Sequence, residues 1–251
     1  MSHPERIVPD ETSPGIVALH LKRYEFAAPF CRGNEVLDAG CGVGYGSAFL
    51  AGVARRVVGV DRDEQAIAYA RKRYARPNVE FRVGDLLRLE VDDASFDAVC
   101  SFETIEHLDY ADAFVAEMAR VLRPGGAFVV STPRAQETIA APENPFHRVE
   151  LSRSDFEALL RRFFGEVELY GQRRHQTARH RLMQRADVLG LRKRLTFLRP
   201  TSRLLGTAPM AEVTADGIVI EREVLESATE LVAVCRKPTL QQSVASVEPT
   251  E

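Results

Sequence analysis

The sequence predicts an α/β protein, built on a mostly parallel sheet of seven strands with helices on both faces and an inserted cap between the last two strands. Two observations support this fold class. Short apolar stretches alternate along the chain with segments whose apolar residues recur at helical spacing. A glycine-rich turn follows the first apolar stretch, as expected where a buried strand runs into a helix. Alternation at this pace predicts right-handed βαβ units, whose helices cover both faces of the sheet.

The expected elements follow the chain in order. Pro14-Gly15 opens a helical segment over 16–30. The first five strands are expected at 35–39, 56–60, 79–83, 96–102 and 127–131, and further helices at 44–52, 63–75, 110–122 and 153–164. VELYGQ and TELVAVCRKP are interpreted as the sixth and seventh strands, and Pro124-Gly125-Gly126 as a turn before the fifth.

The chain of 251 residues fits one domain that is large enough to bury a core without disulfides or metals. We expect a flexible N-terminus over 1–14, a single domain over 15–238 and a disordered tail over 239–251. A long insertion separates the last two expected strands, and we interpret about 173–228 as a cap over the ligand-binding crevice.

Composition predicts a soluble, cytoplasmic protein. The formal net charge is -3, which by itself predicts no polyanionic partner. The N-terminus lacks the apolar stretch of a signal peptide, and no run reaches the length of a membrane span. The cysteines form no C-x-x-C pair, which disfavours a disulfide framework and structural zinc; they are Cys31, Cys41, Cys100 and Cys235.

The stretch EVLDAGCGVGYG, residues 35–46, holds the strongest motif. Its glycines permit positive φ and let a ligand approach the backbone, and the N–H groups that open the next helix can face that ligand. A dinucleotide fingerprint would need glycine three places after Gly42, where Tyr45 stands. The observed spacing is instead D-x-G-x-G-x-G, beginning at Asp38, and we assign Gly46 to packing.

This spacing resembles the first motif of class I S-adenosylmethionine (SAM) dependent methyltransferases, and the resemblance covers roughly residues 16–169. Later landmarks match in order: VVGVD ends on Asp61, VEFRVGD ends on Asp85, and FDAVCSFETIEHL and VLRPGGAFVVSTP follow. The resemblance implies a Rossmann-like fold with SAM as cofactor, the ribose held by Asp61 and the adenine by Asp85 and Leu86. The implied cofactor-binding residues are Tyr24, Asp38, Gly40, Cys41, Gly42, Gly44, Asp61, Arg62, Asp85, Leu86, Phe102 and Glu103.

Other roles stay open for several of these residues. Asp61 also precedes a helix and could serve near its start, and Asp38 could tie the glycine turn. His20, Arg23 and Tyr24 lie on adjacent turns of the first helix, where they either reach the carboxylate of the cofactor or belong to a solvated surface.

The acceptor side of the crevice depends on two stretches, 103–107 after the fourth strand and 144–150 in the loop after the fifth. Methyl transfer is an in-line displacement, and an alcohol acceptor must also lose its proton to a carboxylate, a histidine or a metal-bound base. Our candidate catalytic residues are His147, His107 and Glu106.

The E-x-x-E-H element resembles the metal-ligand set of small-RNA 3′-terminal 2′-O-methyltransferases. It also occurs, with P-F-H, in methyltransferases similar to the ubiquinone-biosynthesis O-methyltransferase and in glycan-modifying relatives. The resemblance implies Mg²⁺ or Mn²⁺ held by Glu103, Glu106, His107 and His147. Alternatively, Glu103 packs near the cofactor while Glu106 and His107 orient the loop.

These observations favour a SAM-dependent O-methyltransferase that acts on a hydroxyl of a small polar acceptor, a sugar or glycoside. The alternatives are an RNA ribose 2′-O-methyltransferase, a quinol O-methyltransferase and a non-catalytic SAM-binding protein. The arginine-rich segment 173–199 would favour RNA, but no stacking platform accompanies it and the overall charge argues against nucleic acid. That segment is otherwise a solvated face or a contact for an acidic patch on a second subunit, which leaves a homodimer open.

Overall fold

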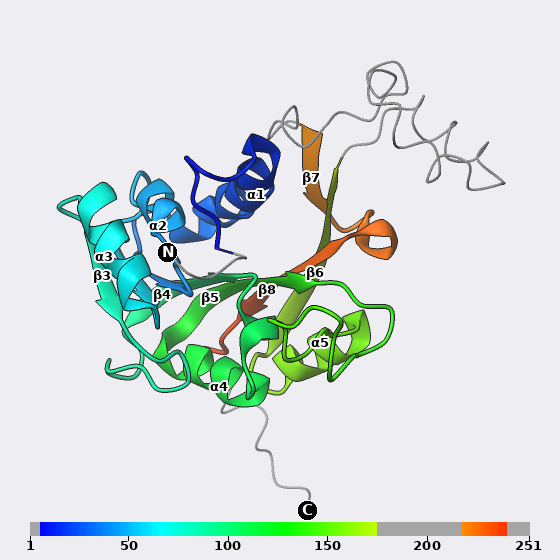
Figure 1. The fold of residues 1–251 in the computed structure, drawn as a ribbon. Coiled ribbons are helices and arrows are strands. Elements are labelled where there is room, and N and C mark those ends of the chain that lie inside the picture. The colour runs from blue at the N-terminus through cyan, green and yellow to red at the C-terminus, as the bar shows by residue number, and fades with distance from the viewer. Residues whose placement is uncertain (1–5, 175–216, 240–251) are drawn as a thin grey trace, which may run out of the picture.

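The structure is a computed structural model and describes residues 6–174 and 217–239. Its centre is one sheet of eight strands in the order β3-β2-β1-β4-β5-β8-β6-β7 (Figure 1). The strands are β1 (Glu35–Ala39), β2 (Arg56–Asp61), β3 (Val79–Val83), β4 (Phe96–Phe102), β5 (Leu122–Pro133), β6 (Glu166–Arg174), β7 (Ile218–Glu221) and β8 (Glu230–Arg236).

The sheet is parallel from β3 to β5 and antiparallel where β8 pairs with β5 and β6, and where β6 pairs with β7. The α/β class and all seven expected strands are therefore confirmed. The eighth strand, β7, lies in the expected insertion and was not predicted as a member of the sheet. β5 also begins at Leu122 and includes the expected Pro124–Gly126 turn, where Gly125 has φ 79° and its N–H donates to the carbonyl of Lys237.

Helices cover both faces of the sheet, α1, α2 and α3 on one and α4 and α5 on the other (Figure 1). Each face has its own apolar core. Tyr24, Ala27 and Leu50 pack on the first face, and Phe114 and Phe156 on the second. The helices are α1 (Pro14–Cys31), α2 (Tyr45–Leu50), α3 (Glu64–Arg73), α4 (Ala111–Val121) and α5 (Arg153–Arg161), with short 3₁₀ turns η1 (Ile105–His107) and η5 (Leu225–Ser227).

Local sequence signals explain where these helices begin. Pro14 occupies the first turn of α1, where the missing N–H is not needed. Asp63 caps α3, since its side chain accepts hydrogen bonds from the backbone N–H groups of Gln65 and Ala66. Ser152 caps α5 by accepting from the N–H of Asp155. The strands β1 to β5 run parallel between these helices, so their carboxyl ends lie at one edge of the sheet.

Several expectations fall partly outside the described residues. The arginine-rich segment and most of the cap lie in 175–216, and the tail lies in 240–251. Within the expected N-terminal segment, Val8 is buried and packs against Val43 and Ala66. The four cysteines are free and buried. Within 6–174 and 217–239, no helix has both the length and the apolar character needed to cross a membrane.

Candidate active site

A cavity of about 880 Å³ opens at the carboxyl ends of the parallel strands. It lies where the strand order changes direction, between β1 and β4, which is where open α/β sheets bind ligands. Most of the predicted residues line it together: Tyr24, Gly40, Cys41, Gly42, Asp61, Arg62, Asp85, Leu86, Phe102, Glu103, Glu106, His107 and His147.

The glycine turn after β1 forms the floor of one end of this cavity. Gly40 has φ 82°, and a Cβ there would lie 2.4 Å from Oγ1 of Thr104, so a larger residue fits neither the backbone nor the space. Gly42 has φ 53°, and nothing lies within 4 Å of the position of its absent Cβ. The turn therefore offers an open stretch of backbone against which a ligand can lie.

The carboxylate of Asp61, at the end of β2, joins this turn to the start of α3. Its Oδ2 accepts from the N–H of Gly42 and its Oδ1 from the N–H of Asp63, both at 2.9 Å. The α3 cap itself is Asp63. Asp61 is thus near the helix start without capping it, and it remains part of the cavity wall.

Two predicted cofactor-binding residues, Asp38 and Gly44, do not line the cavity. Asp38 is buried behind it and accepts hydrogen bonds from Oγ of Ser47 at 2.6 Å and from the hydroxyl of Tyr24 at 3.2 Å. Burial raises the pKa of Asp38 to about 6, against the effect of these two donors. Asp38 therefore ties the turn to α1 and α2, while Gly44, at φ 86°, forms the N-cap of α2.

Glu103 follows β4 and is held in an uncommon backbone conformation with φ 50°. Oγ of Ser131 donates to its Oε1 at 2.7 Å, and Nη2 of Arg23 lies 3.5 Å from its Oε2. Arg23 is itself buried and donates through Nε to Oε1 of Gln172 at 2.6 Å. Arg23 therefore does not belong to a solvated surface. The positive φ of Glu103 is a backbone strain of the kind that is common at functional sites.

His20, from the same helix, lines the cavity, and burial lowers its pKa well below the ordinary value. Its imidazole is consequently neutral near pH 7. His20 therefore faces the cavity and does not belong to a solvated surface.

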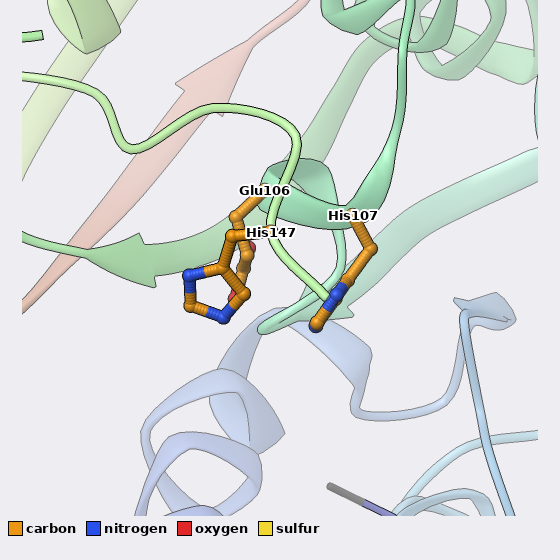
Figure 2. Close-up of side chains that lie close together, drawn as sticks. All are labelled: Glu106, His107 and His147. Carbon is orange, nitrogen blue, oxygen red and sulfur yellow. The ribbon is translucent and has the colours of Figure 1, made fainter. Parts of the chain in front are cut away.

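At the acceptor end, Glu106, His107 and His147 come together from η1 and the loop after β5 (Figure 2). Their potential ligand atoms all lie within 4.8 Å of one another. Glu103, which the sequence analysis placed in the same metal set, does not belong to this group because its carboxylate is turned to Arg23 and Ser131. The loop is fixed to η1 by the N–H groups of Arg148 and Val149, which donate to the carbonyl of Glu106.

Hydrogen bonds define the proton positions on both imidazoles. Nδ1 of His147 lies 2.8 Å from Oε1 of Glu150, and Nδ1 of His107 lies 3.0 Å from the carbonyl oxygen of Phe146. Because a carboxylate and a carbonyl only accept, both Nδ1 atoms carry the proton and the basic lone pair of each ring is on Nε2. This is the tautomer that a general base of this type uses.

Glu106 is the buried member of the group. Burial raises its pKa well above the ordinary value, the negative charge of Glu103 raises it further, and Oγ1 of Thr132 donates to its Oε2 at 3.3 Å. The positive charge of Arg23 and the hydrogen bond from Thr132 act in the opposite direction, but burial outweighs them, so the uncharged carboxyl group is favoured. A bound cation would reverse this preference.

Comparison with known proteins shows similarity to methyltransferases. Residues 37–130 match the family model described as a methyltransferase domain. A probable S-adenosylmethionine-dependent methyltransferase of Mycolicibacterium smegmatis is 47% identical over 151 residues, which cover 58% of this chain and 57% of that protein. A fatty-acid O-methyltransferase of the same species is 38% identical over 109 residues, covering 43% of this chain and 40% of that protein.

The fold is also that of a solved enzyme, the 1,6-didemethyltoxoflavin-N1-methyltransferase of Burkholderia thailandensis with bound 1,6-didemethyltoxoflavin and S-adenosylhomocysteine. The TM-score is 0.54 at 19% identity, covering 88% of this chain and 78% of that one. The fold and the cavity agree with the methyltransferase domain that the family model matches over residues 37–130. The chain is similar to SAM-dependent methyltransferases, and it spans a little over half the length of the first curated relative.

The sequence analysis missed residues that act through distant contacts. Gln172, Arg6 and Ile7 reach the site from parts of the chain that carry no motif, Ser131 reaches it from within β5, and Glu150 reaches it through the neighbouring His147. The spacing of His147 and Glu150, three residues apart, was the one local signal that could have indicated a paired histidine.

Proposed function

We propose that the protein is a SAM-dependent O-methyltransferase that transfers a methyl group to a hydroxyl of a small polar acceptor, a sugar or glycoside. The observation that carries this proposal is the His147–Glu150 pair, with its contact of 2.8 Å, at the acceptor end of the cavity. The fold alone cannot select the acceptor, since the toxoflavin enzyme of the same fold is named for methylation at nitrogen.

When bound, SAM supplies an electrophilic methyl group on a sulfonium. The backbone at Gly40 and Gly42 and the carboxylate of Asp61 would hold its adenosyl part, with Asp85 and Leu86 beside the adenine ring. These residues fit such a ligand because they combine an open backbone surface with carboxylates at two strand ends.

His147 accepts the proton of the acceptor hydroxyl at Nε2 as the new O–CH₃ bond forms and the sulfonium bond breaks, leaving a neutral thioether. Glu150 holds the ring through Nδ1 and stabilises the imidazolium that results. The methyl group thus moves to the acceptor oxygen and the proton to His147, and the positive charge passes from the sulfonium to the imidazolium.

Support for an oxygen acceptor comes from the similarity to the fatty-acid O-methyltransferase, in a match that covers less than half of either chain. Support for a polar acceptor comes from the lining of the cavity, which includes the polar side chains of Asp109 and Asn144 and the aromatic ring of Tyr110 besides His147. Hydrogen-bonding groups next to an aromatic face suit a sugar ring better than a quinone.

The test compares glycosides, a quinol, a fatty acid and an RNA with a free 3′ end as acceptors, with S-adenosylhomocysteine release as the readout. We expect turnover on a glycoside and a fall in kcat of about 10²–10⁴-fold for His147→Ala, with little change in SAM affinity. Glu150→Gln should lower kcat less and change its pH profile. Wild-type kcat in His147→Ala would refute the general-base role, and SAM binding without turnover on any acceptor would favour a binding protein.

A second candidate is metal assistance, which the 4.8 Å group of Glu106, His107 and His147 favours. One carboxylate and two imidazoles suit Mn²⁺ better than Mg²⁺, which prefers oxygen ligands. The ion would act as a Lewis acid on the acceptor oxygen. Activity that a chelator removes and Mn²⁺ restores would support this candidate, whereas activity unchanged by the chelator would refute it.

A further inference from the structure

The segment Arg6–Thr12, which we call the N-terminal strap, forms part of the cavity wall. Arg6 and Ile7 line the same cavity as Asp61 and Arg62, at the end assigned to the adenosyl group. The strap is compact because the N–H groups of Glu11 and Thr12 donate to the carbonyl of Val8, at 2.9 and 2.8 Å. Oγ1 of Thr12 in turn accepts from the N–H of Val8 at 3.1 Å.

A half-buried ion pair fixes one end of the strap. Nη1 of Arg6 donates to Oδ2 of Asp63 at 2.6 Å, and the two side chains are 12% and 23% exposed. The other oxygen of Asp63 caps α3 by accepting from Gln65 and Ala66. The Arg6 hydrogen bond lowers the pKa of Asp63, so the pair stays charged at neutral pH.

An apolar contact fixes the middle of the strap. Val8 is 5% exposed and packs in one cluster with Val43, from the glycine turn, and Ala66, from the first turn of α3. Both partners are fully buried. The strap therefore docks on the two elements whose backbone surrounds Asp61, namely the glycine turn and the start of α3.

From this juxtaposition we propose that the strap is a further part of the cofactor site and retains the bound adenosyl group. Docking of the strap and binding of the cofactor use the same two elements, so each stabilises the other. Release of the product S-adenosylhomocysteine then requires the Arg6–Asp63 contact to open. The inference rests on the proposed function only in that this cavity holds SAM and its product.

The test measures the dissociation rate and Kd of S-adenosylhomocysteine for wild type, Arg6→Ala and Val8→Ser. Arg161→Ala is the matched control, because Arg161 makes an exposed ion pair with Glu157 on α5, far along the chain from the strap. We expect the dissociation rate to rise about tenfold in both strap variants and to stay at the wild-type value in the control. Hydrogen exchange of residues 6–13 should slow when the ligand is added to wild type.

Two results would overturn the proposal. Dissociation rates within twofold of wild type in both strap variants would show that the strap does not retain the ligand. A rate of hydrogen exchange in residues 6–13 that stays the same when the ligand is added would also show this. If wild type itself bound no S-adenosylhomocysteine, the proposed function would fail and the role of the strap with it, so the two failures are distinguishable.

Discussion

Gly46 lies in the first turn of α2, directly beneath the ring of Tyr24, and Gly46→Ala should destabilise the protein. A Cβ at this position would lie 1.9 Å from Cζ of Tyr24 and 2.3 Å from its hydroxyl oxygen, far inside van der Waals contact. The ring must move, which breaks its hydrogen bond to Asp38 and its edge contact with Phe102, whose ring centroid is 4.9 Å away.

Overpacking costs about 1–3 kcal/mol and the lost hydrogen bond about 1 kcal/mol, while alanine gains about 1 kcal/mol over glycine in a helix. The net cost is about 2 kcal/mol, which lowers Tm by about 4–8 °C in a domain of this size. Because Tyr24 lines the cavity, affinity for S-adenosylhomocysteine should fall as well.

Thermal unfolding followed by circular dichroism measures the first effect and calorimetric titration the second. Gly217→Ala is the control, since nothing lies within 4 Å of the Cβ that it adds. A Gly46→Ala variant that melted within about 1 °C of wild type, with unchanged ligand affinity, would refute the packing argument.

Two further substitutions separate structural from ligand-binding carboxylates. Burial raises the pKa of Asp38 from 3.8 to about 6, so the folded state holds this proton more tightly, and about 3 kcal/mol of stability is lost as pH rises from about 4 to 6. Asp38→Asn has no such titration, and urea unfolding at pH 4.5 and 7 should show a smaller fall than in wild type; an equal fall would contradict the assignment. Asp61→Ala removes the carboxylate proposed to accept hydrogen bonds from the ribose, and it also frees the N–H groups of Gly42 and Asp63. Calorimetry should show binding of S-adenosylhomocysteine about 100-fold weaker, and a change under threefold would contradict its role.

The sequence predicted those parts of the molecule that local pattern determines. Apolar runs bounded by turn residues located the first five strands. The acids that follow the second and third strands, Asp61 and Asp85, were thereby placed at one edge of the sheet. Because the carboxyl ends of parallel strands converge, linear order was enough to predict that His107 and His147 would meet. Their separation along the chain did not matter.

Other parts depend on partners that no local pattern reveals. Arg23 has the sequence context of a surface helix, yet Gln172 and Glu103, far along the chain, draw it into the interior. The acid at the start of the glycine motif gave no sign that Ser47 and Tyr24 would enclose it. Polar residues near the N-terminus likewise concealed Val8, whose burial depends on surfaces from the glycine turn and α3.

Gln172 has a consequence for redesign of this protein. Its amide accepts from Arg23 and donates through Nε2 to the carbonyl of Leu19 at 2.8 Å, so it fastens α1 to β6 close to where that strand ends. Replacing the segment after β6 would thus disturb α1 if the junction were placed before Gln172. A splice placed after Arg174 leaves the contacts of Gln172 with Arg23 and Leu19 in place, so the attachment of α1 to β6 is kept.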